Sequence, residues 1–220
     1  MSKVYVFLAD GFEEIEGLTV VDLLRRAGEE VETVSIMGRK MIEGSHKIKV
    51  EADALFEETD FTEGKMLILP GGMPGTRHLG AYKPLTDMLC DWDTKGKQLA
   101  AICAAPSVFG DLGILNGKEA VCYPGFEERL TGATIGEGTV AVTDHVITSR
   151  GMGTAIDFAA ALIARLQDEK KAEEIKASII TDSNAVMEAC TFPREIVQRV
   201  LKIRKKPLKP QKKLAFLKGL

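Results

Sequence analysis

Short apolar runs with strand composition alternate with amphipathic helical segments along most of this chain. Residues 3–8 form the first such run, and Val20, Leu23, Leu24 and Ala27 then fall at the spacing of one helix face. A strand followed by such a helix opens a βαβ unit, because a parallel partner strand needs a crossover connection of this length.

The same alternation continues along the chain. Gly44 and Ser45 flank a predicted hairpin, and the pattern weakens from Ala172 onward. Repeated strand-helix units predict an α/β fold, in which a doubly wound, largely parallel sheet carries helices on both faces. Further strands are expected at residues 31–37, 65–69 and 98–102, strand-like pieces at 119–123, 133–135, 139–143 and 145–149, and helices at 83–95, from Pro106 and at 154–166.

Charge divides the 220 residues into an acidic body and a basic end. Residues 194–220 hold ten Lys or Arg against a single Glu, a net +9; since the whole chain carries −3, residues 1–193 carry −12. An acidic body argues against general nucleic-acid binding, whereas the basic end either contacts an anionic partner or is solvated. We expect one large domain at 1–182 and a basic extension at 183–220, part helix and part tether.

Hydropathy and cysteine spacing favour a soluble cytoplasmic protein. No run of eighteen apolar residues occurs, and the amino terminus lacks a secretory signal pattern. The cysteines and histidines lack the spacing of a disulfide framework or of a zinc site, so we expect reduced thiols and no bound metal. From the hydropathy we expect no membrane contact. The residues concerned are Cys90, Cys103, Cys122, Cys190, His46, His78 and His145.

Cys103 lies between an apolar strand and a helix start, and ligands of doubly wound sheets bind beyond the carboxyl ends of strands. Small neighbours in A-I-C-A-A-P (Ala101–Pro106) permit a tight turn of the nucleophile-elbow type. Unpaired N–H groups at a helix start stabilise a thiolate, so the sequence predicts that Cys103 is ionised near neutral pH. The alternative is a small buried apolar side chain, as most unpaired cysteines are; the strand-end position favours the reactive thiol.

Three carboxylates follow the first strand and compete to be the partner of Cys103. Glu13 and Glu14 suit ordinary first-turn carboxylates, whereas Glu16 lies deeper in the segment beside apolar residues. We therefore prefer Glu16. A protonated Glu16 would hydrogen-bond the thiolate, and the two groups would titrate as a coupled pair.

Gly71 and Gly72 follow another expected strand at the same edge of the sheet. Glycines there let backbone N–H groups approach a reacting oxygen, and the Ala104 N–H would complete an oxyanion hole. The alternative is a tight turn without chemistry. Its position beside the Cys103 elbow favours the binding role.

Four motifs occur together in one order along residues 1–182. In that combination the chain resembles the ThiJ/PfpI superfamily, and most closely the branch of the Parkinsonism-associated protein deglycase and its bacterial relatives. The motifs are G-F-E-E-I-E (Gly11–Glu16), L-P-G-G (Leu69–Gly72), A-I-C-A-A-P (Ala101–Pro106) and T-S-R-G (Thr148–Gly151).

The resemblance implies a flavodoxin-like fold of the class I glutamine amidotransferase-like type and a homodimer, without metal or organic cofactor. It also implies that Cys103 is an oxidisable nucleophile, that Glu16 is its protonated partner, and that Gly72 and Ala104 form the oxyanion hole. Activities ascribed to this branch are glyoxalase-type conversion of methylglyoxal to lactate, repair of early glycation adducts, oxidative-stress sensing and chaperoning.

The chain departs from the family pattern at two positions. Ala104 stands where the protease-like branch has a histidine, so a Cys-His peptidase would lack its general base. Tyr123 stands where the deglycase branch often carries a histidine, which leaves Glu16 as the main proton carrier. His145 follows Asp144 between two expected strands, where a hairpin turn explains it better than catalysis.

Two functional hypotheses follow. In the first, a cofactor-free enzyme of the glyoxalase or deglycase type uses the Cys103 thiolate to attack small reactive carbonyl compounds or glycated side chains, and Glu16 moves the protons. In the second, a redox sensor or chaperone holds an oxidised Cys103 by hydrogen bonds from Glu16 and the elbow N–H groups.

Overall fold

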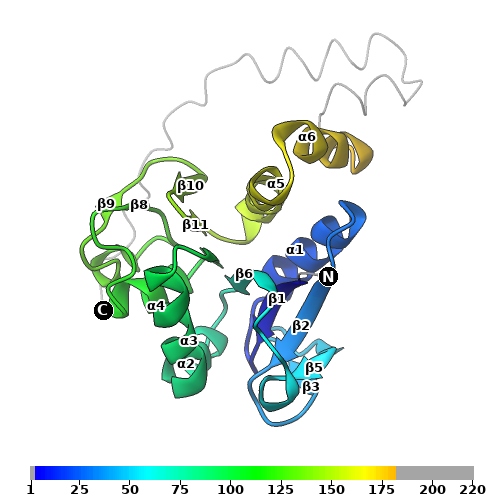
Figure 1. Cartoon of the computed structure of the whole chain (residues 1–220), viewed down its shortest axis with the longest axis vertical. Helices are drawn as coiled ribbons and strands as arrows, with labels where there is room; N and C mark the ends of the chain where they lie inside the picture. Colours follow the sequence, from blue (N-terminus) through cyan, green and yellow to red (C-terminus); the bar gives the residue numbers. More distant parts are fainter. Residues whose placement is uncertain (1–2, 182–220) are drawn as a thin grey trace, which may run out of the picture. The chain divides into compact units, whose positions relative to one another are not determined.

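A seven-stranded sheet runs through the computed structural model, which describes residues 3–181 (Figure 1). The strand order is β10-β11-β7-β6-β1-β2-β5. All neighbouring strands pair in parallel except β10 and β11, which are antiparallel. The strands are β1 (Lys3–Leu8), β2 (Val31–Ser35), β5 (Ala54–Leu55), β6 (Gly64–Leu69), β7 (Gln98–Ile102), β10 (Val140–Thr143) and β11 (Val146–Ser149).

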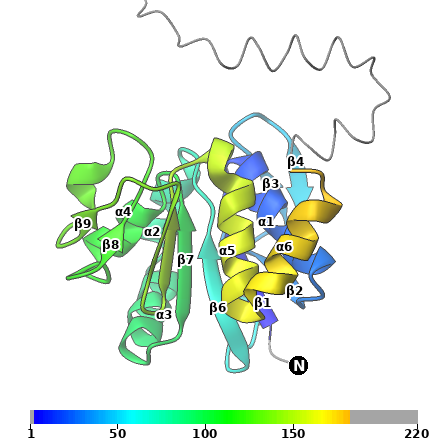
Figure 2. The same cartoon turned by 90° about the horizontal axis from the view of Figure 1, so that it is seen from above.

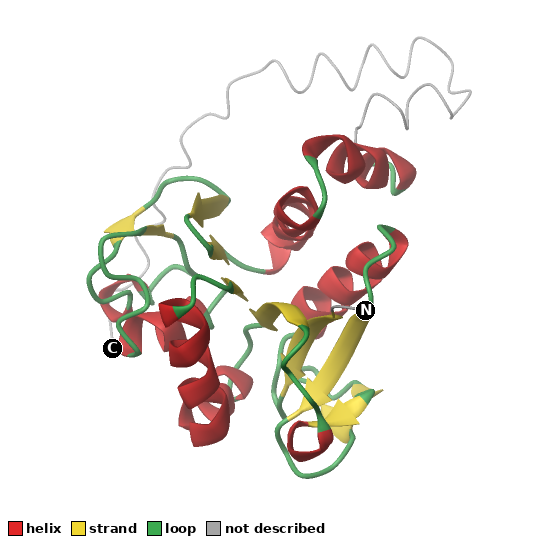
Figure 3. Ribbon diagram, viewed as in Figure 1, coloured by secondary structure: helices red, strands yellow, loops and turns green. Residues whose placement is uncertain are grey.

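Helices cover both faces of this sheet, as the views in Figures 2 and 3 show. On one face lie α1 (Glu14–Arg26), α5 (Ala155–Leu166) and α6 (Glu169–Ser178). On the other lie α2 (Gly75–Ala81), α3 (Lys83–Thr94) and α4 (Pro106–Asp111). The predicted doubly wound, largely parallel α/β fold is therefore confirmed.

Smaller elements fill the connections. Strands β3 (Met41–Glu43) and β4 (Lys49–Glu51) form the hairpin predicted around Gly44, and β8 (Glu119–Ala120) pairs with β9 (Thr134–Ile135). Within residues 3–181 there are also three short 3-10 turns: η1 (Phe56–Glu58), η2 (Glu127–Arg129) and η3 (Met152–Thr154).

Because of the register of the central strands, the loops that follow them lie together at the carboxyl ends of the strands. Leu69 at the end of β6 pairs with Ala101 of β7, and Ser149 at the end of β11 pairs with Ile102. Strands β6 and β7 are buried on both faces over most of their length, which is why their sequences are nearly continuous apolar runs. Residues 70–72, 103–105 and 150–152 consequently emerge side by side.

Several expected elements are shorter than predicted. The strand expected at 31–37 ends at Ser35, whose hydroxyl donates to the Arg39 carbonyl and accepts from the Met37 N–H, turning the chain. The strand expected at 119–123 ends at Ala120, because the Val121 N–H donates to the Thr148 hydroxyl instead of continuing the ladder. Helices α2 and α6 and strand β5 are additions that the sequence reading did not predict.

The predicted extension at 183–220, the boundary before it and Cys190 lie outside the described residues, so those statements stay predictions. Between residues 3 and 181 no helix is both long and apolar enough to cross a membrane.

Candidate active site

Cys103 occupies a strained turn directly after β7. Its φ is 65°, a left-handed conformation that residues other than glycine rarely adopt and that often marks a functional site. Its N–H donates to the Ser149 carbonyl at 2.9 Å, and its own carbonyl accepts the Tyr123 N–H at 2.8 Å. The predicted elbow is confirmed, and so is the position of Tyr123 beside it.

Glu16 reaches this elbow from the first turn of α1. Its side chain is 1% exposed and accepts the Gly71 N–H at 2.9 Å. It also shares a hydrogen bond with the Cys103 thiol and accepts the Met152 N–H. The predicted approach of Glu16 to Cys103 is therefore confirmed, and the T-S-R-G motif contributes by leading into Met152.

Glycines are required where β6 ends because the chain passes between the two reactive groups. A Cβ on Gly71 would lie 2.5 Å from Cys103 Cβ and 2.6 Å from a Glu16 carboxylate oxygen. Gly72 has φ +89°, and a Cβ there would lie 2.3 Å from the Glu13 nitrogen. The N–H groups of Gly72 and Ala104 both hydrogen-bond the Cys103 sulfur, so the predicted donors converge on it.

Burial sets the protonation of the pair. Burial raises the pKa of Glu16 to about 7, although hydrogen bonds to Cys103 and Gly71 lower the pKa in part. It also raises the pKa of Cys103 to about 12, and the Glu16 charge adds to that increase. The prediction of a Cys103 ionised near neutral pH is therefore wrong. The Gly72 and Ala104 N–H groups do lower the pKa of Cys103, but burial and Glu16 outweigh them, and α4 is only 6 residues long.

The two other acidic residues of G-F-E-E-I-E have a structural task that the sequence reading missed. Glu14 is 2% exposed, and one of its oxygens accepts the His46 N–H at 2.8 Å while the other lies 3.1 Å from the Ser45 hydroxyl. The Glu13 carboxylate lies 3.1 Å from the same hydroxyl. They anchor the β3–β4 turn to the start of α1. The only signal for this contact in the sequence is that an acidic run and a polar turn both occur.

Glu13, Glu14 and His46 also form the one group of metal-ligand atoms within the described range, all within 4.8 Å of one another. Hydrogen bonds to the β3–β4 turn already occupy these atoms, so we assign no metal to them.

The histidines and the other thiols stand apart from the elbow. His145 lies in the turn between the antiparallel strands β10 and β11, at the ends of the strands opposite to Cys103, which confirms the hairpin interpretation. Its Nε2 lies 2.8 Å from an Asp93 oxygen. His78 Nδ1 lies 3.0 Å from the Asp10 carbonyl. Cys90, Cys103 and Cys122 are free thiols, as predicted for these three.

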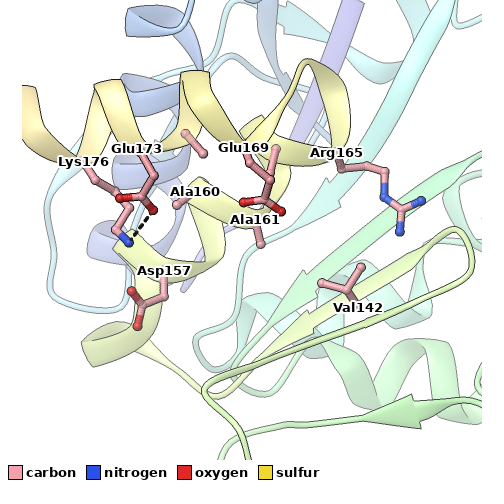
Figure 4. Close-up of a pocket in the computed structure, with 10 residues that line it drawn as sticks. Val142, Asp157, Ala160, Ala161, Arg165, Glu169, Glu173 and Lys176 are labelled. Carbon is pink, nitrogen blue, oxygen red and sulfur yellow. Dashed lines mark hydrogen bonds and ion pairs between the residues drawn. The ribbon is translucent and has the colours of Figure 1, made fainter.

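A hollow of about 570 Å³ lies elsewhere, between α5, α6 and the edge strand β10 (Figure 4). Small side chains such as Ala160 and Ala161 form its wall, and the Lys176–Glu173 ion pair at 3.0 Å bridges its rim. None of the predicted site residues lines it.

The fold and the elbow define a flavodoxin-like protein of the class I glutamine amidotransferase-like type. Residues 2–165 match the model of the DJ-1/PfpI family. The chain belongs to this family, as its four motifs predicted.

Individual relatives agree with this assignment. DJ-1 homolog B of Arabidopsis thaliana is 38% identical over 184 residues, which are 83% of this chain and 42% of the relative. The chain thus spans less than half the length of that relative. A deglycase of Pyrococcus abyssi is 29% identical over 153 residues, 69% of this chain and 91% of the relative. The structure of oxidized DJ-1 from Toxoplasma gondii is similar, with a TM-score of 0.79 and 37% identity, covering 82% of this chain and 98% of that one.

Proposed function

We propose that the protein is a cofactor-free enzyme of the glyoxalase or deglycase type, acting on α-oxoaldehydes or on early glycation adducts. The observation that carries the proposal is the hydrogen-bonded pair of Cys103 and Glu16, held by converging backbone N–H groups at a strained strand end. The deglycase name of the Pyrococcus abyssi relative supports the same class.

The first step forms a hemithioacetal. The Cys103 sulfur attacks the aldehyde carbon of methylglyoxal, and the Glu16 carboxylate takes the thiol proton as the sulfur–carbon bond forms. The aldehyde oxygen becomes an oxyanion, and we expect the Gly72 and Ala104 N–H groups, which act on the Cys103 sulfur, to stabilise it. A Glu16 pKa of about 7 suits this task, because the group both accepts and returns a proton near neutral pH.

The later steps need only proton transfers and water. Glu16 first returns the thiol proton to the oxyanion and is then free to carry the proton of the former aldehyde carbon to the neighbouring ketone carbon. The hydroxyl proton on the first carbon passes to the ketone oxygen, so the first carbon is oxidised as the second is reduced. The product is a lactyl thioester on Cys103. Water hydrolyses it to lactate and regenerates the thiol, so methylglyoxal plus water gives lactic acid without an external oxidant or reductant.

Lactate formation from methylglyoxal tests the proposal in the wild type, in Cys103→Ser and in Glu16→Gln. Each variant should lose at least about a hundredfold in turnover, the usual scale for losing a nucleophile or an acid-base group. Equal rates in all three proteins would remove the proposed activity. The control is Cys90→Ser, which alters a thiol on α3 away from the elbow.

A redox-sensing function is the second candidate. Two N–H groups that face the Cys103 sulfur would equally hold the oxygens of a sulfinate, and the Toxoplasma gondii relative is described as oxidized. The homodimer, the cytoplasmic location and a chaperone activity stay predictions.

A further inference from the structure

A chain of hydroxyl groups fixes the segment that follows β11. The Gly151 N–H donates to Thr154 Oγ1 at 3.1 Å, and this oxygen lies 2.7 Å from Ser149 Oγ. The Ser149 hydroxyl donates in turn to the Thr139 carbonyl at 2.8 Å. The chain thus ties both ends of residues 149–151 to the neighbouring loop.

The number of available protons gives this chain a direction. Each hydroxyl has one proton to donate, and Ser149 uses its own on Thr139. The Thr154 proton has two acceptors in reach, Ser149 Oγ at 2.7 Å and the Gly151 carbonyl at 2.8 Å. Because the Ser149 proton is already used on Thr139, the 2.7 Å contact between the two hydroxyls needs Thr154 as its donor, and we assign the Thr154 proton to Ser149.

Thr154 does not serve the helix that it precedes. A threonine at this position ordinarily caps the helix by accepting one of its first N–H groups. Here Thr154 is the residue before α5, yet its side chain makes no capping hydrogen bond. Its hydroxyl is instead turned back toward Ser149 and Gly151, where it accepts the Gly151 N–H at the start of the 3-10 turn η3, so it fixes this turn and not α5.

The segment so held touches both members of the reactive pair. The Ser149 carbonyl accepts the Cys103 N–H at 2.9 Å, and Glu16 Oε1 lies 3.8 Å from the position that a Cβ on Gly151 would take. The next backbone N–H, that of Met152, lowers the pKa of Glu16. The Met152 side chain is 54% exposed and gives its backbone little anchorage of its own. From this geometry we infer that Thr154 is a positioning residue, which holds the 149–152 segment so that its backbone sets the protonation of the Cys103–Glu16 pair.

This inference rests on the proposed proton-carrying role of Glu16 and extends it to a residue outside direct contact. The titratable groups that act on Glu16 are Cys103, through its hydrogen bond, and Glu13, through its charge. The Tyr123 ring and Glu16 Oε1 both lie within 4 Å of the position that a Cβ on Gly151 would take. Met152 lowers the pKa of Glu16, so losing this donor should raise it.

The test is the pH dependence of Cys103 alkylation, read by peptide mass in Thr154→Val. Losing a hydrogen bond to a charged carboxylate should move the midpoint up by about one pH unit, so the rate at pH 7 should fall roughly fivefold. Thr154→Ser, which keeps the hydroxyl, should restore the wild-type midpoint. Thr143→Val is the matched control, because it removes a hydroxyl donor to the Glu119 carbonyl (3.1 Å) at the opposite end of β10.

A midpoint unchanged in Thr154→Val, or shifted equally in Thr143→Val, would overturn the inference. In a Glu16→Gln background Thr154→Val should have no further effect on the midpoint. Should Thr154→Val fail to fold, Ser149→Ala tests the same chain by removing the link to Thr139. Alkylation of Cys103 does not depend on turnover, so the two proposals can fail separately. A shifted midpoint in a protein that forms no lactate would contradict only the proposed activity. Lactate formation with an unchanged midpoint would contradict only this inference.

Discussion

The thiol of Cys103 donates a hydrogen bond to the carboxylate of Glu16, which is 1% exposed. Burial moves the first proton loss of this pair from 4.5, the ordinary value of a glutamate, to about 7. Between there and about 12, where the thiol titrates, the pair keeps one proton. Near neutral pH it therefore alternates between two protonation states, as an acid-base catalyst should.

Alkylation of Cys103 should follow this titration. Its rate with iodoacetamide should rise with pH through a midpoint near 7, because the Glu16 carboxylate then accepts the thiol proton. In Glu16→Gln that midpoint should disappear, leaving one titration between 9.0, the ordinary thiol value, and about 12. Peptide mapping across pH 5–10 measures both proteins; a wild-type midpoint below about pH 6 would show a stable thiolate and contradict the assignment.

Stability should fall as pH rises through the titration of Glu16. The folded state binds this proton more tightly than the unfolded state, so the benefit is complete below 4.5 and is lost as pH passes about 7. The gap between these values corresponds to roughly 3 kcal/mol. Relative to Glu16→Gln, the wild type should lose this amount between pH 4.5 and pH 8 in urea unfolding. A difference that does not change with pH would refute the raised pKa.

Gly71→Ala should disrupt the pair by steric means. The added methyl group would lie 2.5 Å from Cys103 Cβ, 2.6 Å from a Glu16 oxygen and 2.9 Å from the Ile102 carbonyl. Such overpacking should cost about 1–3 kcal/mol and separate the two reactive groups. Gly153→Ala is the control, since nothing lies within 4 Å of its Cβ position. Unfolding free energies and Cys103 alkylation rates together decide; equal behaviour of the two variants would exclude the close approach.

Most of the fold could be predicted from local sequence patterns. Strand β1 and strand β7 match their predicted bounds because fully buried strands are continuous apolar runs between turn residues. Helix α2 was not predicted, because its seven residues, G-T-R-H-L-G-A, contain two glycines and no complete apolar face. Strand β5, two residues long, is defined by pairing with β2 rather than by composition.

The site was predictable in its residues but not in its electrostatics. The elbow at Cys103 follows from a strand, small neighbours and a proline, all visible in the sequence. The pKa of Cys103 depends on how much water reaches the sulfur and on its distance from Glu16, which only the three-dimensional structure gives. The burial of Glu14 depends likewise on the β3–β4 turn, far along the chain.

Mild peroxide should oxidise Cys103 in preference to the other described thiols. Cys122 is 4% exposed, and a single backbone N–H, that of Phe126, acts on its sulfur. At Cys103 the Gly72 and Ala104 N–H groups would stabilise the added oxygens, and Glu16 lies ready to donate a hydrogen bond to them.

Peptide mass spectrometry after peroxide treatment should therefore find two added oxygens on the Cys103 peptide and none on those of Cys90 and Cys122. Glu16→Gln keeps a hydrogen-bond donor and should still form the sulfinate, whereas Glu16→Ala should yield more of the sulfonate or less product. Oxidation spread evenly over the three thiols would mean that the converging N–H groups do not stabilise an oxidised sulfur. In that event the redox-sensing function would lose its structural basis, while the proposed enzymatic activity, which lactate formation tests separately, would be unaffected.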